Sequence, residues 1–542
     1  MRRNLVLLTV LITVFMGTFG VAFVVQQVKA VGPYYIKADG SIFPDTPLIS
    51  TTDNVTYTLT GTIVIGTHND GIVVEKDNIV IDGAGYILQG PGSTYLDTEG
   101  IRAQEIHNIT IRNITITSFR TGIWLWFCPN CTIYGNNITN TYQGIHFNNY
   151  SNYTNVYENN IANNDAGIIL SYSWNSSIYG NNIEGNDLVG ISIGSFSHNI
   201  DVYDNNITDN HNGVGLGSSH NNIHGNNITD NNNYGMTCSC SNYSIYENNI
   251  TGNTKYGIYL LSSSSNNSIF DNEINANGFS GINLYSSSND NEIYGNRIAN
   301  NIQHGVLLHG SADYNKIFGN NVTENGGSGF FVSDCLGNEI YENDIESNDN
   351  GVNIGGSLNT SVHGNRITGN GYGIYLGGSS NYTAIFENEI TTNTHGICFY
   401  DSSNHNIISG NNITNSLSYG IRLSESSNNT FYHNYFINNT NQVYVEPDNP
   451  NTWDDGYPSG GNYWSDYADV DQYSGPYQNE TGSDLIWDHP HVINENNQDN
   501  YPIVPEFPAF LILPLFMITT LLAVIVLRLL NTILSTKERV AS

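Results

Sequence analysis

A repeat of 22 to 24 residues dominates this sequence and restricts the folds open to it. Each repeat contains short segments in which apolar and polar residues alternate, such as Ile258-Tyr259-Leu260 and Glu273-Ile274-Asn275. Alternation over only three residues indicates strands, because a helix needs a longer apolar pattern. A glycine followed by an apolar residue marks each repeat, at Gly100, Gly122, Gly144, Gly167, Gly190, Gly213, Gly235, Gly257, Gly281, Gly305, Gly329, Gly351, Gly373, Gly396 and Gly420.

Strands that advance by one coil per repeat form a parallel β-helix, in which each turn buries its apolar face against its neighbours. We therefore expect an all-β, right-handed parallel β-helix, since nearly all parallel crossovers are right-handed. The repeats predict a solenoid of about 14–16 coils. N- and C-terminal caps are expected at its ends, because open sheet edges invite pairing with other chains.

Three asparagine positions in the repeat have different predicted roles. The first, as at Asn181, precedes Ile, Val or Phe by two residues in every repeat, so we expect it to point inward and form a ladder. The second varies, as at Glu273 and Arg297, which only an outward position tolerates. The third, as at Asn186 and Asn210, is expected to begin a turn that the repeat glycine closes in left-handed geometry.

Apolar segments flank the repeats and define the predicted domain boundaries. Residues 1–30 are typical of a signal peptide cleaved near Val28-Lys29-Ala30, with an uncleaved anchor as the alternative. Residues 31–95 are predicted to form the N-terminal cap and first coils, 96–440 the β-helix repeats, and 441–508 the C-terminal cap and hinge. Residues 509–530 are predicted to be one C-terminal transmembrane helix, with a buried core helix as the alternative.

The charges give a predicted location and exclude one class of partner. Arg528, Lys537 and Arg539 follow the apolar run, so the tail at 531–542 is expected in the cytoplasm. The predicted location is therefore the cell membrane, with a single membrane pass and the body of the protein outside the cell. The formal net charge of −33 repels phosphates and argues against a nucleic-acid partner. Many Asn-x-Ser/Thr sequons, such as Asn137 and Asn227, fit an exported glycoprotein, although an Asn-rich repeat also generates them by accident.

No catalytic residue is predicted. The outward positions two and four residues after each glycine, from Gly122 onward, contain no carboxylate, so a paired-carboxylate hydrolase site is not expected there. Acidic and basic residues beside the first asparagine, such as Glu273 and Arg297, are expected to form ion pairs across strands.

The cysteines do not predict a metal centre. The pairs Cys128/Cys131 and Cys238/Cys240 are five coils apart and cannot share one ion, and Cys238 is expected in the core. For Cys128/Cys131 a disulfide and a metal both remain open. Soft copper ligands are not clustered, so no cofactor is expected on these grounds.

One outward column is aromatic. In most repeats an aromatic residue stands two positions before the first asparagine. These aromatic rings either stabilise the β-helix or form a platform for sugars. The predicted carbohydrate-binding residues are Tyr134, Tyr157, Tyr179, Tyr203 and Tyr246.

The closing segment carries a family resemblance. Four features resemble archaeal NosD-type β-helix proteins: IVIDGAGYILQG (Ile79 to Gly90), the N-x-I coils, GGNYWSDY (Gly460 to Tyr467) and NENNQDNYPI (Asn494 to Ile503). Relatives carry an Asp-Gly-rich loop near the end that is similar to calcium sites, which implies calcium at Asp466, Asp469, Asp471 and Asp484. The copper-related maturation role that gives the family its name is also implied, although no copper constellation is present in the sequence.

The predicted function is a cell-surface, membrane-anchored β-helix module that is structural or binds carbohydrate, with a polysaccharide or glycan as partner. The alternatives are a polysaccharide-active enzyme (a lyase, hydrolase or epimerase) and the copper-related role.

Overall fold

The computed structural model describes residues 28–30, 32–66, 68–95 and 97–504. The chain divides into two compact units, residues 1–307 and 308–542, which are described separately. Among the described residues there is no helix with the length and apolar character needed to span a membrane. Most of the predicted signal peptide, and the predicted transmembrane helix and tail, lie outside the described residues, so these remain predictions.

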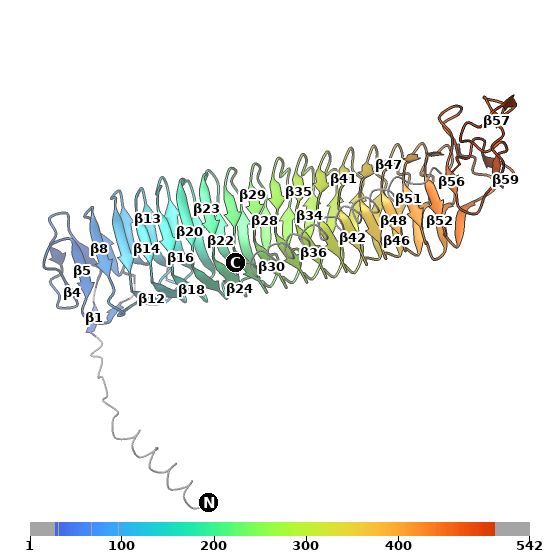
Figure 1. Ribbon diagram of the computed structural model, residues 1–542. Coiled ribbons are helices and arrows are strands. Elements are labelled where there is room, and N and C mark those ends of the chain that lie inside the picture. Colours follow the sequence, from blue (N-terminus) through green and yellow to red (C-terminus); the bar gives the residue numbers. More distant parts are fainter. Residues whose placement is uncertain (1–27, 31, 67, 96, 505–542) are drawn as a thin grey trace, which may run out of the picture. The chain divides into compact units, whose positions relative to one another are not determined.

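Unit 1 consists of three parallel sheets, A, B and C, to which each coil contributes one strand (Figure 1). Sheet A contains β1 (Val28–Ala30), β6 (Ile63–Ile65), β9 (Ile87–Gln89), β12 (Thr115–Thr117), β15 (Asn137–Thr139), β18 (Asn160–Ala162), β21 (Asn182–Glu184), β24 (Asn206–Thr208), β27 (Asn227–Thr229), β30 (Asn249–Thr251), β33 (Glu273–Asn275) and β36 (Arg297–Ala299). Sheet B contains β2 (Tyr34–Ile36), β7 (Ile72–Val74), β10 (Glu99–Gln104), β13 (Thr121–Trp126), β16 (Gln143–Asn148), β19 (Ala166–Leu170), β22 (Val189–Ile193), β25 (Asn212–Leu216), β28 (Met236–Cys238), β31 (Ile258–Leu260) and β34 (Ile282–Tyr285). Sheet C contains β5 (Thr56–Leu59), β8 (Ile79–Asp82), β11 (Ile109–Arg112), β14 (Thr132–Tyr134), β17 (Asn155–Tyr157), β20 (Ser176–Tyr179), β23 (Ile200–Tyr203), β26 (Asn222–His224), β29 (Ser244–Tyr246), β32 (Ser268–Phe270) and β35 (Glu292–Tyr294).

Unit 2 repeats the same three-sheet pattern, and β37 (Val306–His309) contains the boundary between the units. Its sheet A strands are β39 (Asn321–Thr323), β42 (Asp344–Glu346), β45 (Arg366–Thr368), β48 (Glu389–Thr391), β51 (Asn412–Thr414), β54 (Tyr435–Ile437) and β56 (Tyr463–Trp464). Its sheet B strands are β40 (Ser328–Ser333), β43 (Asn350–Gly355), β46 (Tyr372–Gly377), β49 (His395–Phe399), β52 (Tyr419–Leu423) and β55 (Asn441–Val445). Its sheet C strands are β38 (Lys316–Phe318), β41 (Glu339–Tyr341), β44 (Ser361–His363), β47 (Ala384–Phe386), β50 (Ile407–Ser409) and β53 (Thr430–Tyr432).

The register explains why the repeat is so regular. Consecutive strands of a sheet pair in parallel with equivalent residues opposite each other, so Ile178 faces Val202 in sheet C and Ile183 faces Ile207 in sheet A. These four side chains are fully buried. The prediction of an all-β, right-handed parallel β-helix is confirmed. One apolar core runs along the axis of each unit and stabilises this fold.

The first asparagine of each repeat forms the predicted inward ladder. Asn205 is 1% exposed, its Nδ2 donates to Asn226 Oδ1 at 2.9 Å, and its Oδ1 accepts the Asn181 backbone N–H at 3.0 Å. The same bonds recur from Asn136 to Asn248 in unit 1. The ladder therefore satisfies a backbone amide at every bend between sheets C and A.

The third asparagine was assigned the wrong role by the sequence. It forms a second buried ladder, in which Asn186 Nδ2 donates to Asn210 Oδ1 at 2.7 Å and Asn210 Oδ1 also accepts the Asn186 backbone N–H at 3.0 Å. The left-handed residue of this turn is the one before it, as at Gly185 and Asp209.

The repeat glycine also has a different purpose from the predicted one, since its φ lies outside the left-handed region. A Cβ on Gly213 would lie 2.5 Å from the carbonyl oxygen of Gly235 and 2.7 Å from Ile228 Cγ2. The glycine is therefore required by the close approach of successive coils.

The outer face of sheet A has its own cross-strand contacts. Exposed asparagines form a third ladder, in which Asn206 Nδ2 donates to Asn182 Oδ1 at 2.7 Å and Asn227 Nδ2 to Asn206 Oδ1 at 2.8 Å. Arg297 pairs with Glu273 in unit 1, which confirms the prediction of ion pairs across strands. In unit 2 the matching pair is Arg366 with Asp344, at 2.7 Å.

Both ends of the chain contribute to the solenoid as well as to caps. Residues near the N-terminus form antiparallel pairs, β3 (Ile42–Phe43) with β2 and β4 (Ile49–Ser50) with β5. The C-terminal region adds two hairpins, β57 (Tyr473–Ser474) with β58 (Glu480–Thr481) and β59 (His491–Asn494) with β60 (Asn497–Asp499). The described residues make about 17 turns, more than the 14 to 16 expected, because segments taken as caps also coil.

Candidate functional site

The predicted carbohydrate-binding tyrosines form a continuous ring stack on sheet C of unit 1. Neighbouring ring centroids are 5.0 Å apart between Tyr134 and Tyr157, 5.0 Å between Tyr157 and Tyr179, and 4.9 Å between Tyr179 and Tyr203, with interplanar angles of 2°, 10° and 5°. His224 connects this stack to Tyr246. Each inner ring is covered on both faces by its neighbours, so the stack presents ring edges and hydroxyls outward.

The predicted calcium ligands do not gather into a metal site in the described structure. Asp469 accepts from His489 Nδ1 at 2.7 Å, and Asp471 accepts from Ser483 Oγ at 2.6 Å. Asp484 accepts from Gln478 Nε2 at 3.1 Å, while Asp466 lies in the turn after β56. Within residues 28–504, apart from the three undescribed positions, no group of three or more His, Cys, Asp or Glu side chains is arranged to hold a metal ion.

The cysteines are buried thiols. All six are free, and Cys238 lies in the core as predicted. Cys131 Sγ donates to the Cys128 carbonyl at 3.3 Å, and no disulfide joins this pair. Burial raises the pKa of Cys128 to about 11 and that of Cys131 to about 12, so both stay protonated at neutral pH.

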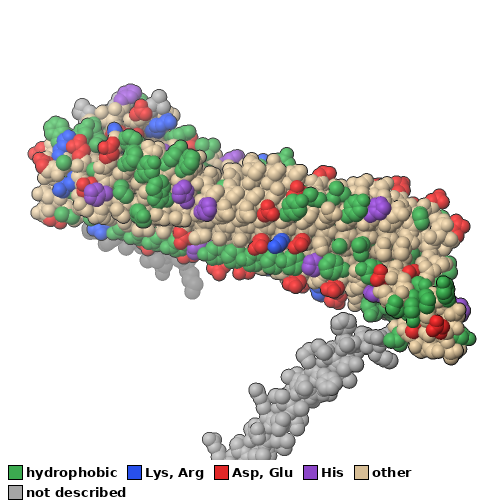
Figure 2. Space-filling model, turned by 90° about the horizontal axis from the view of Figure 1, so that it is seen from above, with side chains coloured by type: hydrophobic (Ala, Val, Ile, Leu, Met, Phe, Trp, Pro, Cys, Tyr) green, Lys and Arg blue, Asp and Glu red, His purple; other side chains and the backbone are tan. Residues whose placement is uncertain are grey.

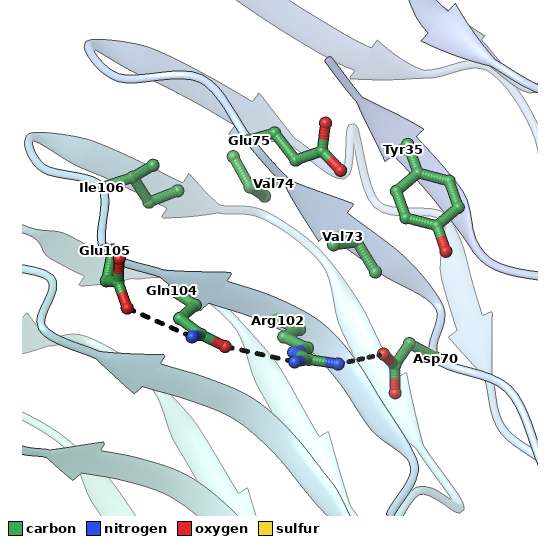
Figure 3. Close-up of a pocket in the computed structure, with 9 residues that line it drawn as sticks. All are labelled: Tyr35, Asp70, Val73, Val74, Glu75, Arg102, Gln104, Glu105 and Ile106. Carbon is green, nitrogen blue, oxygen red and sulfur yellow. Dashed lines mark hydrogen bonds and ion pairs between the residues drawn. The ribbon is translucent and has the colours of Figure 1, made fainter. Parts of the chain in front are cut away.

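A pocket opens on the outer face of sheet B in the first coils of unit 1, with a volume of about 410 Å³. β2, β7 and β10 supply Tyr35, Val73 and Arg102 to its wall. Figure 3 shows Arg102 between Asp70 and Gln104, at 3.4 Å from Asp70 Oδ2 and 3.2 Å from Gln104 Oε1. The pocket therefore combines an aromatic ring with a chain of polar groups that are held in fixed orientations.

Asp70 is part of an acidic pair at the edge of this pocket. It is 8% exposed, and its Oδ1 accepts the backbone N–H of Glu99 at 3.0 Å. The pKa of Glu99 is raised to about 8, first by burial and then by the hydrogen bond and charge of Asp70. Glu99 therefore holds its proton at neutral pH more readily than an exposed glutamate does.

A ridge of aromatic side chains begins beside the pocket and runs along the turns from sheet B to sheet C. We define this aromatic ridge as Trp124, Trp126, Phe127, Tyr150, Tyr172, Trp174 and Phe196. Arg102 lies 5.5 Å from the ring centroid of Trp124, and a second pocket lined by Glu105, Ile106 and Phe127 joins the first pocket to the ridge. Figure 2 shows hydrophobic side chains gathered over these N-terminal coils.

The ridge differs from the tyrosine stack in ring exposure. Tyr150 and Trp174 meet edge to face at 87°, and Trp126 meets Phe127 at 65°, whereas Trp124 stacks on Trp126 and Tyr172 stacks on Phe196, so the ridge is only partly stacked. Phe127 is 37% exposed, Tyr150 47% and Phe196 61%. These ring faces are open to a flat apolar ligand surface such as that of a sugar.

The backbone of the ridge is unusual in a way that stability alone does not explain. Phe127, Tyr150, Tyr172 and Phe196 have φ between 52° and 65°, a conformation that bulky residues rarely adopt. Equivalent turns elsewhere have Ser263 in unit 1 and Asp334, Gly356 and Ser402 in unit 2. The left-handed turn is therefore a property of the repeat, and the unusual feature of the ridge is that aromatic residues occupy it, as strained residues often do at functional sites.

Sequence reasoning missed both the pocket and the ridge. The search for outward carboxylates covered the positions two and four residues after each glycine from Gly122 onward, whereas Asp70 and Glu99 stand directly before two earlier glycines, Gly71 and Gly100. The acidic pair therefore lies outside the positions to which that prediction applied. The ridge was missed because most of its residues lie in turns, outside the strand alternation that was followed.

The family comparison covers both units. The family model described as "Periplasmic copper-binding protein (NosD)" matches residues 190–304 and 311–469, just over half of the chain. The model described as "Right handed beta helix region" matches residues 48–207 and 99–246. No curated protein matches the chain.

Solved structures with a similar course of the chain include three carbohydrate-active proteins. The periplasmic alginate epimerase AlgG is 15% identical with a TM-score of 0.34, covering 62% of this chain and 78% of that one. DFA-IIIase from Arthrobacter chlorophenolicus A6, in complex with GF2, is 14% identical with a TM-score of 0.38, covering 53% and 83%. The A-module of mannuronan C-5 epimerase AlgE6 from Azotobacter vinelandii is 14% identical with a TM-score of 0.28, covering 72% and 88%.

At these TM-scores none of the three bears on what this chain does. The family models, the asparagine ladders and the three parallel sheets agree with one another. The chain therefore belongs to the NosD family of right-handed parallel β-helix proteins.

Proposed function

We propose that this protein is a cell-surface, membrane-anchored module that binds a polysaccharide on the aromatic ridge and the adjoining pocket of unit 1. The carrying observation is the ridge itself, in which exposed rings occupy strained turn positions that small polar residues fill elsewhere. Rings at differing angles offer faces to successive sugars, and the polar groups around Arg102 orient the chain end. Weak contacts repeated along several coils add up to useful avidity.

A neutral polysaccharide is the better ligand for this surface. The positive charge of Arg102 is balanced by Asp70, and Glu75 and Glu105 also line the first pocket. A polyanion would meet this acidic wall and the net charge of −33 without a free cation to compensate. We propose the tyrosine stack as a second contact, which binds sugar hydroxyls through its phenol groups.

Affinity electrophoresis in gels that contain neutral polysaccharides separates the two surfaces. We expect the full-length Trp126→Ala/Tyr150→Ala/Trp174→Ala variant to lose retardation, because the exposed faces are removed. The Tyr157→Ala/Tyr179→Ala/Tyr203→Ala variant should lose less, because its ring faces are covered in the wild type. Circular dichroism checks that both variants fold. If the folded ridge variant is retarded like wild type in every gel, the ridge is not the binding surface.

A polysaccharide-active enzyme is the second candidate, and the acidic pair favours it. The pKa of Glu99 is raised to about 8, so this side chain can donate a proton to a leaving group, which is the general-acid step of glycan cleavage. Release of reducing ends or unsaturated products by wild type, and its loss in Glu99→Gln, would establish this activity. Binding without any product over the same incubation would leave the module as a binder.

The copper implied by the family description does not fit the described residues. The thiols of Cys238 and Cys240 are buried beside Tyr243, the one described methionine, Met236, is fully buried, and no third donor joins them. We derive no step through copper. The membrane anchor and the extracellular location stay proposals from the sequence, and protease accessibility of the full chain on intact cells tests them.

A further inference from the structure

A second cluster of aromatic residues lies on the outer face of sheet B in unit 2, on β46, β49, β52 and β55. We define this arginine–tyrosine surface as Tyr372, Tyr375, His395, Tyr400, Tyr419, Arg422 and Tyr444. Parallel register brings the residues into columns, with Tyr372 opposite His395, His395 opposite Tyr419, and Arg422 opposite Tyr444. Four consecutive coils therefore contribute to one patch.

Arg422 is held by rings instead of carboxylates. Its guanidinium carbon lies 5.5 Å from the ring centroid of Tyr400, 5.8 Å from that of Tyr444 and 5.9 Å from that of Tyr419. Tyr372, His395 and Tyr419 stack at 4.9 Å and 5.8 Å. The rings fix the orientation of the guanidinium without neutralising its charge.

The charge of Arg422 is unusual in this acidic protein. Of the six arginines in the described part of the chain, Arg102, Arg112, Arg297 and Arg366 form ion pairs with Asp or Glu. Arg422 and Arg120 form none and lie against tyrosine rings. With 49 acidic residues against 16 basic ones, a carboxylate partner would be easy to supply.

A neighbouring carboxylate, that of Glu446, has other hydrogen-bond partners. Glu446 accepts hydrogen bonds from Ser424 Oγ at 2.5 Å, from the Glu425 backbone N–H at 3.1 Å and from Asn449 Nδ2 at 3.3 Å. Asp401 and Glu425 are exposed in the turns at the rim. Glu446 thus lowers the local potential without contacting the guanidinium.

The surface is rich in donors that have no protein partner. Within the described residues, the hydroxyls of the five tyrosines form no hydrogen bond to protein, whereas Arg422 Nε and His395 Nδ1 lie buried beneath the surface and also lack a protein partner. Burial raises the pKa of Tyr400 to about 12, so its hydroxyl stays a donor at neutral pH. A ligand that fits this surface must therefore supply acceptors.

We propose that the arginine–tyrosine surface binds an anionic saccharide, whose carboxylate or sulfate accepts from the Arg422 guanidinium and whose hydroxyls contact the tyrosine hydroxyls. A planar guanidinium matches a carboxylate in two parallel hydrogen bonds, and the surrounding rings exclude water from that contact. This site stands apart from the neutral-glycan site proposed in unit 1 and does not depend on it.

The test compares one polymer in two charge states. Full-length protein is titrated with oligogalacturonate and with the same oligomer after methyl esterification of its carboxyl groups, at about 0.15 M salt, where the Debye length of about 8 Å screens the overall negative charge. We expect at least tenfold tighter binding of the acid form by wild type. Competition with dextran sulfate distinguishes a carboxylate-selective site from one that accepts both anions.

Two variants locate the site. Arg422→Gln should lose the preference for the acid form, whereas Arg120→Gln, which removes the other ring-held arginine, should keep it. The Trp126→Ala/Tyr150→Ala/Trp174→Ala variant should also keep it, which separates this proposal from that for the ridge. Equal binding of acid and ester by wild type, or an unchanged preference in folded Arg422→Gln, would overturn the proposal. The acid and ester comparison needs only wild type, so it stands even if Arg422→Gln fails to fold.

Discussion

Replacing Asn205 by alanine tests whether the inward ladder holds the coils together. The substitution removes the donors to Ile178 O, Tyr203 O and Asn226 Oδ1, each at 2.9 Å. It also removes the acceptor of the Asn181 backbone N–H and of Asn181 Nδ2. Asn181 Nδ2 keeps its bonds to Val156 O and Tyr179 O, but no other acceptor reaches the Asn181 backbone N–H.

The magnitude follows from the groups left without partners. A buried polar group without a hydrogen bond costs about 1–3 kcal/mol, and Asn205→Ala leaves one such group, the Asn181 backbone N–H. The free energy of unfolding should therefore fall by about 1–3 kcal/mol. Its neighbour Asn206 belongs to the exposed ladder of sheet A, so Asn206→Ala should cost less than about 1 kcal/mol.

Urea unfolding followed by circular dichroism measures both costs, and hydrogen exchange reports on the Asn181 amide directly. That amide should exchange faster in Asn205→Ala and at the wild-type rate in Asn206→Ala. Equal losses of stability in the two variants, or an unchanged Asn181 amide in Asn205→Ala, would show that the ladder contributes little.

Three other perturbations have clear expected outcomes. Gly213→Ala should destabilise unit 1 by about 1–3 kcal/mol, because the new Cβ would clash with Gly235 O. Gly215→Ala should be tolerated, because the nearest neighbour of its Cβ would lie 3.7 Å away. Equal urea midpoints for the two variants would contradict this. Burial raises the pKa of Asp499 to about 7 despite its hydrogen bonds from Asn462 and Trp464. As pH rises, the unfolded chain loses this proton before the folded protein does, so the contribution of Asp499 to stability should fall between about pH 4 and pH 7. Thermal unfolding of Asp499→Asn should not show this fall of the melting temperature with pH. The protein should retain no stoichiometric copper after dialysis against a chelator, and metal analysis that finds one copper per chain would refute the reasoning from its donors.

Most of the fold could be predicted from the sequence because each coil repeats the same partners. Asn181 and Ile183 recur at every turn, and only an inward position demands such constancy. The roles of Gly213 and Asn210 could not be derived in this way, because a glycine that avoids a clash and one that closes a turn look alike in a repeat. Three-dimensional contacts between coils decide between them.

The candidate sites were harder to predict because they break the repeat. Phe127 and Tyr150 lie in turns whose lengths vary, and Asp70 precedes the first regular coil. Arg422 was visible in an outward column, but its lack of a carboxylate partner depends on what surrounds it in space. The roles of residues that depart from the repeat therefore have to be read from the structure.

The ladders also make the length of the protein an evolvable quantity. Every coil in the middle of unit 1 offers the next one the same amides, the same glycine gap and the same apolar faces. Deleting residues 182–205 would join Asn181 to Asn206 and restore the sequence Asn-Asn-Ile-Thr with every ladder one rung shorter. Recombination between repeats in the coding DNA can therefore add or remove whole coils, whereas loss of a single residue from a strand would turn its core side chains outward. The length of unit 1 can therefore change in steps of one coil, and no new kind of contact is needed.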